Sequence, residues 1–238
     1  MTLVADQGSV RYGRRTVVDS VSLTLGPGLH ALMGQNGAGK TTLLRTMATL
    51  QKPSSGTISL GEAVWPDGDV RLLRRRLGYL PQDTMRRSRL TVAEHLSYMC
   101  WLRKIPEDKA PAEVDRALDS INLTAERDTR IGALSGGMRR RVGVGSAIIG
   151  DPDLVILDEP SAGLDVSQRE SLRDITAQIA TRAVVVVSTH IVEDILTVAD
   201  TVTVMKTGTI VTHCPRRDFA RDGDLADFER RYLAMVRS

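Results

Sequence analysis

The chain has 238 residues, of which 42% are hydrophobic and 26% are charged, a composition that excludes a largely disordered protein. This length suits one large domain, or one domain that carries an inserted lobe. The formal charge of +3 and the aromatic content of 3% are too low to indicate nucleic-acid binding, so no nucleic-acid partner is expected.

Cysteine content and hydropathy favour a cytoplasmic location. Cys100 and Cys214 form neither a metal-binding spacing nor a disulfide framework, which fits a reducing compartment. Residues 1–25 lack the charged start and the continuous apolar core of a signal peptide. No stretch approaches the ~20 apolar residues that a membrane-spanning helix requires. We therefore expect any role at a membrane to depend on a partner.

Arginines are grouped in three short runs, at Arg74–Arg76, at Arg86, Arg87 and Arg89, and at Arg139–Arg141. Such runs usually form the solvated face of a helix, and this is the favoured interpretation for each. Contact with an anionic membrane surface or with a partner protein is the alternative.

Strand patterns occur in both halves of the chain. In residues 8–28, GSVRYGRRTVVDSVSLTLGPG, polar and apolar residues alternate as in a strand, and Gly and Pro interrupt the alternation. This pattern predicts a small antiparallel β portion. Further on, short buried strands alternate with helical patterns, which predicts an α/β fold with a mainly parallel sheet. The expected strands are Leu29–Gly34, Leu77–Leu80, Leu154–Glu159 and Ala183–His190, with a helix at Lys40–Leu50 and a late hairpin at Thr201–His213 before one last helix.

Between Leu90 and Gly150 the pattern is helical throughout. Thr91 and Glu94 form a capping box ahead of Leu96, Met99 and Leu102, which we expect on one helix face. A second helix is predicted at Ala112–Ile121. We interpret residues 86–150, approximately, as a helical lobe inserted between two sheet strands of a single domain spanning residues 1–238.

The stretch GQNGAGKT matches the phosphate-binding Walker A loop, with a strand before it and a helix after it. Gly37 and Gly39 would let the backbone approach phosphate oxygens, and the helix N-terminus adds aligned N–H groups. Lys40 would reach the β- and γ-phosphates, and the Thr41 hydroxyl would bind Mg²⁺. The expected cofactors are ATP and Mg²⁺, and the expected phosphate-binding residues are Gly34, Gln35, Asn36, Gly37, Ala38, Gly39, Lys40, Thr41 and Thr42.

An acidic pair follows the strand LVILDE. Asp158 is placed to hold the Mg²⁺, and Glu159 to polarise an attacking water as a general base. Taken alone, such a pair would more often be an ordinary helix N-cap. Beside a complete phosphate loop, the catalytic interpretation is favoured.

The stretch LSGGM contains a second place that could hold an anion. Ser135, Gly136 and Gly137 precede a helical run, so backbone N–H groups at a helix N-terminus would be open to close approach. A simple tight helix cap is the alternative.

Together these motifs resemble the nucleotide-binding subunit of an ATP-binding cassette (ABC) transporter over essentially the whole chain. LSGG is similar to the family signature in the helical lobe. The resemblance implies that Tyr12 stacks on adenine, that Gln82 is the Q-loop glutamine acting in catalysis and on Mg²⁺, that Asp165 is the D-loop aspartate and that His190 is the catalytic switch histidine. It also implies a head-to-tail dimer, as a homodimer or a heterodimer, in which each signature caps the γ-phosphate held by the partner's phosphate loop.

Three positions depart from the family pattern: Met138 replaces the usual signature Gln, while Gln35 and Val166 stand where Pro is common. None of these changes removes a group expected on phosphate or metal. Because Glu159 and His190 are present, we expect an active ATPase and not an accessory protein that binds ATP without hydrolysing it.

In detail the motifs look most similar to bacterial ABC-2 type exporter subunits, which pair with a separate integral membrane permease. The resemblance implies a subunit held at the inner face of the membrane by that permease. Docking would fall at residues 82–101, with Arg86, Arg87, Arg89, Tyr98 and Trp101 as candidate contacts, although Tyr98 and Trp101 could equally pack inside the lobe. An importer subunit, and a non-transport ABC ATPase acting on ribosomes or DNA, remain alternatives.

Overall fold

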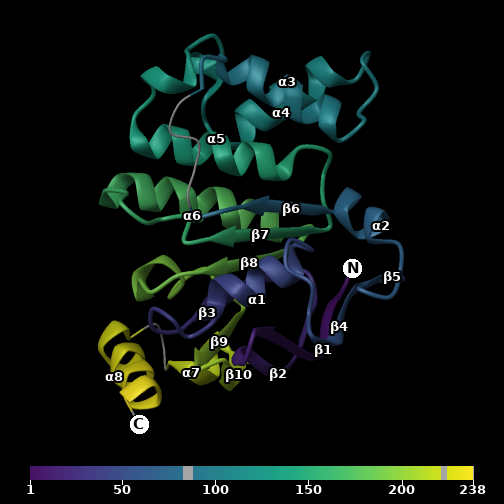
Figure 1. The fold of residues 1–238 in the computed structure, drawn as a ribbon. Coiled ribbons are helices and arrows are strands. Elements are labelled where there is room, and N and C mark those ends of the chain that lie inside the picture. Colours follow the sequence, from purple (N-terminus) through teal and green to yellow (C-terminus); the bar gives the residue numbers. More distant parts are fainter. Residues whose placement is uncertain (83–87, 221–223, 238) are drawn as a thin grey trace.

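Two sheets and a layer of helices build the protein, as a computed structural model shows for residues 1–82, 88–220 and 224–237 (Figure 1). The expected α/β class is confirmed. The expected antiparallel portion is a four-stranded sheet of order β2-β1-β4-β5. Its strands are β1 (Leu3–Tyr12), β2 (Arg15–Leu25), β4 (Ser55–Leu60) and β5 (Ala63–Trp65), of which the sequence analysis did not identify the last two.

The central sheet has six strands in the order β10-β9-β3-β8-β7-β6. Neighbours from β9 to β6 pair in parallel, and β10 pairs antiparallel with β9 as the predicted hairpin. The strands are β3 (Gly28–Met33), β6 (Leu77–Leu80), β7 (Leu154–Asp158), β8 (Val184–Ser188), β9 (Thr201–Lys206) and β10 (Thr209–Pro215). Each predicted strand is found, shorter by a residue or two at its end in several cases.

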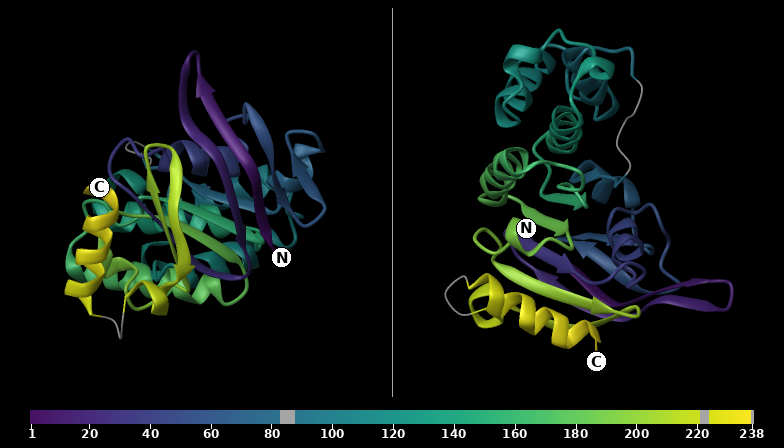
Figure 2. Two further views of the ribbon diagram at one scale, coloured as in Figure 1. Left: turned by 90° about the horizontal axis from the view of Figure 1, so that it is seen from below. Right: turned by 90° about the vertical axis from the view of Figure 1, so that its left-hand side faces the viewer.

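Helices cover both faces of this sheet and extend from one edge of it. On the sheet lie α1 (Lys40–Met47), α2 (Val70–Arg75), α6 (Val166–Ala180), α7 (Arg216–Phe219), α8 (Leu225–Arg237) and a 3₁₀ turn, η3 (Val192–Asp194). The helical lobe contains α3 (Val92–Leu102), α4 (Ala110–Ser120), α5 (Gly136–Ile148) and the turns η1 (Thr124–Glu126) and η2 (Ile131–Ala133). Figure 2 shows the lobe at one end of the molecule, α8 at the other, and the β1–β2 hairpin projecting sideways.

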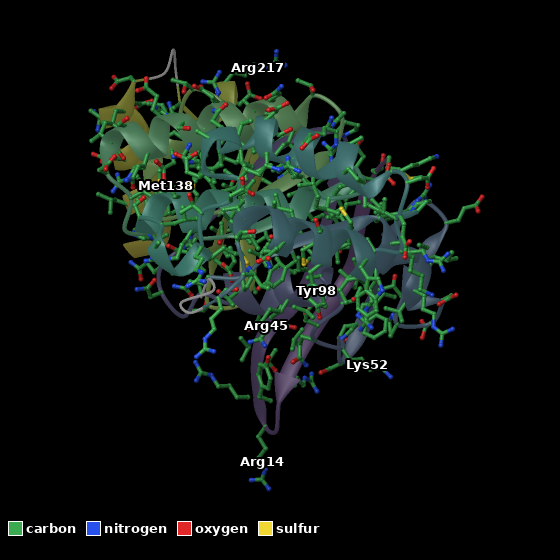
Figure 3. The ribbon with its side chains drawn as sticks, turned by 90° about the horizontal axis from the view of Figure 1, so that it is seen from above. Arg14, Arg45, Lys52, Tyr98, Met138 and Arg217 are labelled. Carbon is green, nitrogen blue, oxygen red and sulfur yellow. The ribbon has the colours of Figure 1, made fainter. Side chains whose placement is uncertain are left out.

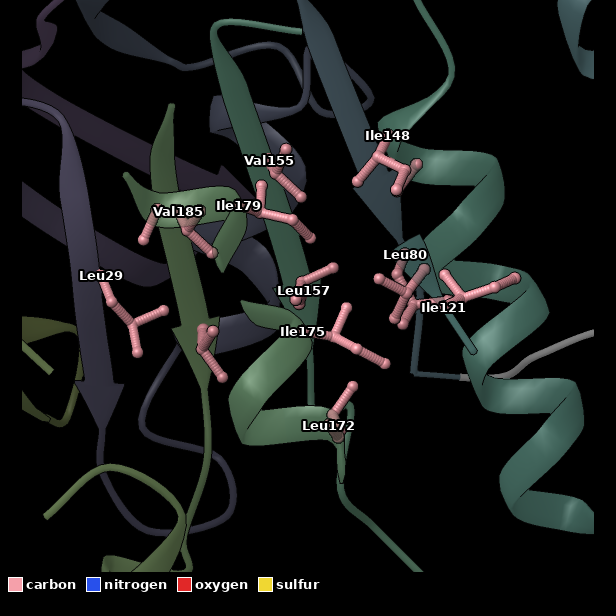
Figure 4. Close-up of a cluster of buried hydrophobic side chains, with 14 of the residues drawn as sticks. Leu29, Leu80, Ile121, Ile148, Val155, Leu157, Leu172, Ile175, Ile179 and Val185 are labelled. Atoms are coloured by element: carbon pink, nitrogen blue, oxygen red, sulfur yellow. The ribbon is translucent and has the colours of Figure 1, made fainter. Parts of the chain in front are cut away.

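Continuous apolar strands produce two cores because neighbouring side chains of a strand point to opposite faces of the sheet. On one face, Val155, Leu157 and Val185 pack with Ile175 and Ile179 of α6 (Figure 4). On the other face, residues such as Ile156 and Val186 pack with α1 and with the antiparallel sheet. The first core continues into the helical lobe, so the lobe and the sheet share buried side chains.

Helix α3 of the lobe begins as predicted, and its buried face differs from the prediction at one position. Thr91 and Glu94 form the expected capping box of α3. Leu96 is buried, but Leu102 is 49% exposed, whereas Cys100 is buried. The face of α3 toward the core follows a spacing of four residues (Val92, Leu96, Cys100), so Leu102 in the last turn has rotated away from it.

Helix α5 lies directly against strand β6 and joins the lobe to the sheet. A Cβ atom added at Gly78 of β6 would lie 1.9 Å from the carbonyl oxygen of Ala147 in α5. Glycine is therefore required here by the close approach of two backbones.

We expect Gly78→Ala to lower the free energy of unfolding by about 2–3 kcal/mol, because the strand and the helix must separate to accept a methyl group. Chemical denaturation followed by circular dichroism measures this change. Gly26→Ala is the matched control, since a Cβ there meets no described atom within 4 Å. Equal stability of the two variants would show that α5 and β6 are less closely packed than the structure has them.

Candidate active site

An open cavity of about 420 Å³ lies at the end of β3, where the phosphate loop leads into α1. Most of its lining comes from the predicted site. The lining residues are Arg15, Val17, Asn36, Gly37, Gly39, Lys40, Thr41, Thr42, Gln82 and Glu159. The fold thus brings the phosphate loop together with Gln82 and Glu159. Arg15 and Val17 of β2 were missed, because nothing in their local pattern separates them from other strand residues.

The glycines of the phosphate loop have different structural roles. Gly37 has a φ of 83°, and a Cβ there would meet no described atom within 4 Å, which leaves its backbone open toward the cavity. Gly39, with a φ of 103°, is the N-cap of α1, and a Cβ there would lie 2.7 Å from the Val17 carbonyl oxygen. Close approach to phosphate thus fits Gly37, whereas Gly39 also permits packing against β2. Of the other predicted loop residues, Gly34 and Ala38 are buried and Gln35 is exposed, and none of the three lines the cavity.

The side chain of Lys40 is held by carbonyl groups of its own loop. Its side chain is buried, and Nζ donates hydrogen bonds to the carbonyl oxygens of Gly34 (2.7 Å) and Gln35 (3.2 Å). Burial lowers the pKa of Lys40, and the nearby carboxylates of Glu159 and Asp158 raise it in partial compensation. An ammonium group removed from water in this way gains strongly from phosphate oxygens that replace its carbonyl partners.

Asp158 is completely buried at the end of β7, and its two carboxylate oxygens have different surroundings. Oδ1 accepts hydrogen bonds from Ser188 Oγ (2.6 Å) and Thr41 Oγ1 (3.3 Å). Oδ2 has no hydrogen-bond partner among the described residues. Ser188 was missed by the sequence analysis, and it lies here because β7 and β8 pair with Asp158 opposite Ser188.

This arrangement fits the predicted Mg²⁺. A buried carboxylate oxygen without a donor, beside a threonine hydroxyl, supplies the hard oxygen ligands that Mg²⁺ prefers. The described part of the chain has no group of three or more His, Cys, Asp or Glu side chains that could hold a metal alone. The cation would therefore depend on further oxygens, such as those of a bound triphosphate.

Glu159 and His190 form a pair at the edge of the cavity. Glu159 is 8% exposed, and its Oε2 lies 2.8 Å from His190 Nδ1, whose side chain is half exposed. The helix N-cap interpretation of the acidic pair is wrong, because Asp165 is the N-cap of α6, accepting a hydrogen bond from the Gln168 N–H at 2.8 Å. Glu159 therefore presents its carboxylate to the cavity and has no capping role.

The signature residues lie apart from the cavity. Ser135 is the N-cap of α5, accepting from the Met138 N–H at 3.2 Å, so the helix-cap interpretation also holds. Gly136 is open to solvent, and a Cβ at Gly137 would lie 2.5 Å from the Gln168 side chain of α6. The signature thus lies beside the loop of Asp165, and none of these residues lines the cavity. Figure 3 shows Met138 at the left of the molecule, well separated in this view from Arg14 at the tip of the β1–β2 hairpin.

Tyr12, the expected adenine contact, is the last residue of β1 in the same hairpin. It is 49% exposed, its hydroxyl donates to Gln51 Oε1 at 3.1 Å, and it is not part of the cavity lining. Its ring is thus accessible, and its role toward a base stays a prediction.

A phosphate loop after β3 of a mainly parallel sheet, with a buried aspartate and a glutamate at the end of β7, two strands away, defines a phosphate-loop nucleoside triphosphatase. Comparison with known proteins narrows this class. The ABC transporter family profile matches residues 18–162. The chain belongs to the ABC transporter family and carries its ATPase domain.

Among curated relatives, the ABC transporter ATP-binding protein YxlF of Bacillus subtilis (strain 168) is 38% identical over 180 residues, covering 76% of this chain and 59% of YxlF. The Nod factor export ATP-binding protein I of Burkholderia orbicola (strain AU 1054) is 36% identical over 204 residues, covering 83% of this chain and 66% of that protein. The chain therefore spans less than two thirds of the length of these relatives.

Two solved structures share the fold. An ATP-binding subunit of an ABC transporter superposes with a TM-score of 0.86 at 24% identity, covering 99% of both chains. A bacterial Atm1-family ABC exporter with ATP bound gives a TM-score of 0.81 at 22% identity, covering 98% of this chain and 41% of the exporter. The predicted architecture is thereby confirmed.

Proposed function

We propose that this chain is the ATP-hydrolysing subunit of a membrane exporter, working with a separate permease and a second nucleotide-binding subunit. One observation carries the catalytic part: Glu159, paired with His190, lines the same cavity as the phosphate loop, and Asp158 accepts a hydrogen bond from Thr41 of that loop. This is the set of groups that phosphoryl transfer to water requires.

In this proposal different residues of the chain bind the triphosphate, accept the proton of the water and hold Mg²⁺. Backbone N–H groups from Asn36 to Thr42 and the ammonium of Lys40 hold the triphosphate. Glu159 accepts the proton of the attacking water, and His190 orients the Glu159 carboxylate through the 2.8 Å contact. Thr41, Asp158 and Gln82 would hold Mg²⁺, which when bound offsets negative charge on the phosphates.

A second subunit would complete the site. The signature and the Asp165 loop lie together but away from the cavity, so a head-to-tail partner is needed to bring Ser135–Gly137 onto the phosphates. Val166, next to Asp165, is 79% exposed, which suits a surface that a partner covers. The partner is a second copy of this chain or a related subunit.

The exporter assignment draws on the names of relatives, since a Nod factor export protein and a bacterial Atm1-family ABC exporter are among the similar proteins. No helix among residues 1–82, 88–220 and 224–237 is long and apolar enough to cross a bilayer. In this proposal a separate permease supplies the path for the cargo, and the subunit binds it at the inner face of the membrane.

Co-purification tests this function. Tagged Glu159→Gln protein, expressed at native level, is extracted from membranes in mild detergent with ATP, and its partners are identified. Recovery of a multi-span membrane protein supports the proposal and identifies the permease, and a transport assay with that permease then separates export from import. Ribosomes or DNA-bound proteins, with the membrane fraction empty, would overturn the transport assignment.

The docking surface for the permease is proposed on the outer side of α3. Tyr98 and Trp101 stack on each other with ring centroids 5.9 Å apart, and they are 49% and 68% exposed, so neither packs inside the lobe. The end of α3 also borders a groove of about 240 Å³ whose lining is mostly basic: Arg71, Arg74, Arg75, Leu102, Arg103 and Lys104. Of the other candidate contacts, Arg89 is exposed, and Arg86 and Arg87 lie outside the described residues.

Replacing both aromatic residues (Tyr98→Ser with Trp101→Ser) is expected to reduce permease recovery at least tenfold, because exposed aromatics are frequent energetic centres of interfaces. ATP hydrolysis by the isolated subunit should stay unchanged, since no residue of α3 lines the cavity. Val211→Ser, at another exposed apolar residue, is the control. Undiminished recovery with the double variant would place the docking surface elsewhere.

A further inference from the structure

Arg140 is a buried cation, 5% exposed, in the first turns of α5, directly after the signature. Its guanidinium donates to three backbone carbonyls from two separate loops. Nε bonds the Pro160 oxygen at 2.8 Å, Nη1 bonds the Gln82 oxygen at 2.7 Å, and Nη2 bonds the Glu159 oxygen. For this residue the solvated-face interpretation of the arginine run is wrong.

The neighbouring arginines behave differently. Arg139 donates to the Leu134 oxygen at 2.6 Å, and Arg141 donates to the oxygens of Ile121 (3.4 Å) and Asn122 (3.1 Å). Those acceptors belong to the helical lobe itself. Arg140 instead joins the lobe to the two loops that carry the proposed catalytic side chains.

The contact with Arg140 matters because the backbone of Glu159 is strained and is held in place by hydrogen bonds. Glu159 has a φ of 51°, a left-handed conformation that is strained for a residue with a side chain. Its N–H is held by Ser188, with bonds to Oγ at 2.9 Å and to the carbonyl oxygen at 3.2 Å. Its carbonyl is held by Arg140. Hydrogen bonds therefore hold both the N–H and the carbonyl of this strained residue. The direction of its carboxylate depends on both bonds.

We propose that Arg140 is a positioning residue: through the carbonyls of Glu159 and Gln82 it sets the Glu159 carboxylate against the attacking water, and it couples the signature helix to hydrolysis. This inference rests on the proposed role of Glu159 as the base. Because Arg140 lies on the same rigid helix as Ser135–Gly137, a displacement of the signature by a partner's phosphates is transmitted to the backbone of Glu159. Bonding three carbonyls at once requires the planar guanidinium of arginine with its several N–H donors, which lysine lacks.

The first measurement compares Arg140→Lys with the control Arg141→Lys. Both variants keep the positive charge and the helix, but Arg141 does not bond the loops that carry Gln82 and Glu159. We expect Arg140→Lys to lower kcat by about 10–100-fold with KM for ATP within about threefold, since misplacing a reacting group affects chemistry more than binding. Arg141→Lys should stay within about twofold of wild type by the same reasoning. Equal kcat for Arg140→Lys and wild type would overturn the proposal. Thermal melting confirms folding, and Arg140→Gln is measured in its place if the lysine variant does not fold.

A double-variant cycle separates positioning from general structural support. If Arg140 acts through Glu159, Arg140→Lys should cause no further loss of kcat in a Glu159→Gln background. Multiplicative losses would mean that Arg140 acts independently of the carboxylate and would overturn the proposal. Turnover near wild type in Glu159→Gln alone would overturn the base assignment itself, and this result is seen before Arg140 is changed.

Discussion

Glu159→Gln is expected to lower kcat for ATP hydrolysis by about 10²–10⁴-fold while ATP binding is retained, because the amide keeps the size of the carboxylate but cannot accept the proton of the water. The backbone bonds of Glu159 to Ser188 and Arg140 do not involve the side chain and should survive the change. Phosphate release under steady-state conditions measures the loss, and titration with a fluorescent ATP analogue measures binding.

Glu193→Gln is the matched control, since Glu193 is an exposed carboxylate in η3 and lines no part of the cavity. It should hydrolyse ATP at the wild-type rate. If the Glu159 variant also does so, another group activates the water.

Lys40→Ala should weaken ATP binding by about 10–100-fold, the range expected when a charged hydrogen-bond donor to phosphate is lost. The effect is large because Lys40 is buried at the cavity, with the carboxylates of Glu159 and Asp158 near enough to raise its pKa. Without it the triphosphate would meet two carboxylates with less compensating charge. Isothermal titration calorimetry with Mg²⁺ and ATP measures the change in Kd.

Lys52→Ala serves as the comparison, because Lys52 is exposed and outside the lining of the cavity. Its Kd should match wild type. Unchanged affinity in Lys40→Ala would mean that the loop does not bind the triphosphate through this lysine, and the phosphate-loop assignment would fail.

Much of the fold and part of the site could be predicted because the signals are local in the chain. A capping box at Thr91 and Glu94 lies within four residues, and the phosphate loop between a strand and a helix spans eight. Continuous apolar runs such as residues 154–157 indicate strands buried on both faces. These features follow from hydrogen bonding and burial within a short segment, so the residues themselves determine them.

Local patterns predicted burial less well for helix residues that could face either the core or the solvent. Leu102 fits a helical face but is exposed, and Arg140 fits a solvated run but is buried. Both outcomes depend on which neighbouring element covers a given helix face.

The sequence by itself determined the phosphate loop, the acidic pair and the alternation of strands and helices. The tertiary structure alone decided that Ser188 lies opposite Asp158, that Arg15 and Val17 line the cavity, and that Arg140 reaches the carbonyls of Gln82 and Glu159. The physical reason is distance along the chain. Strand order and the packing of α5 on β6 join segments that lie dozens of residues apart, and no local pattern specifies such pairs.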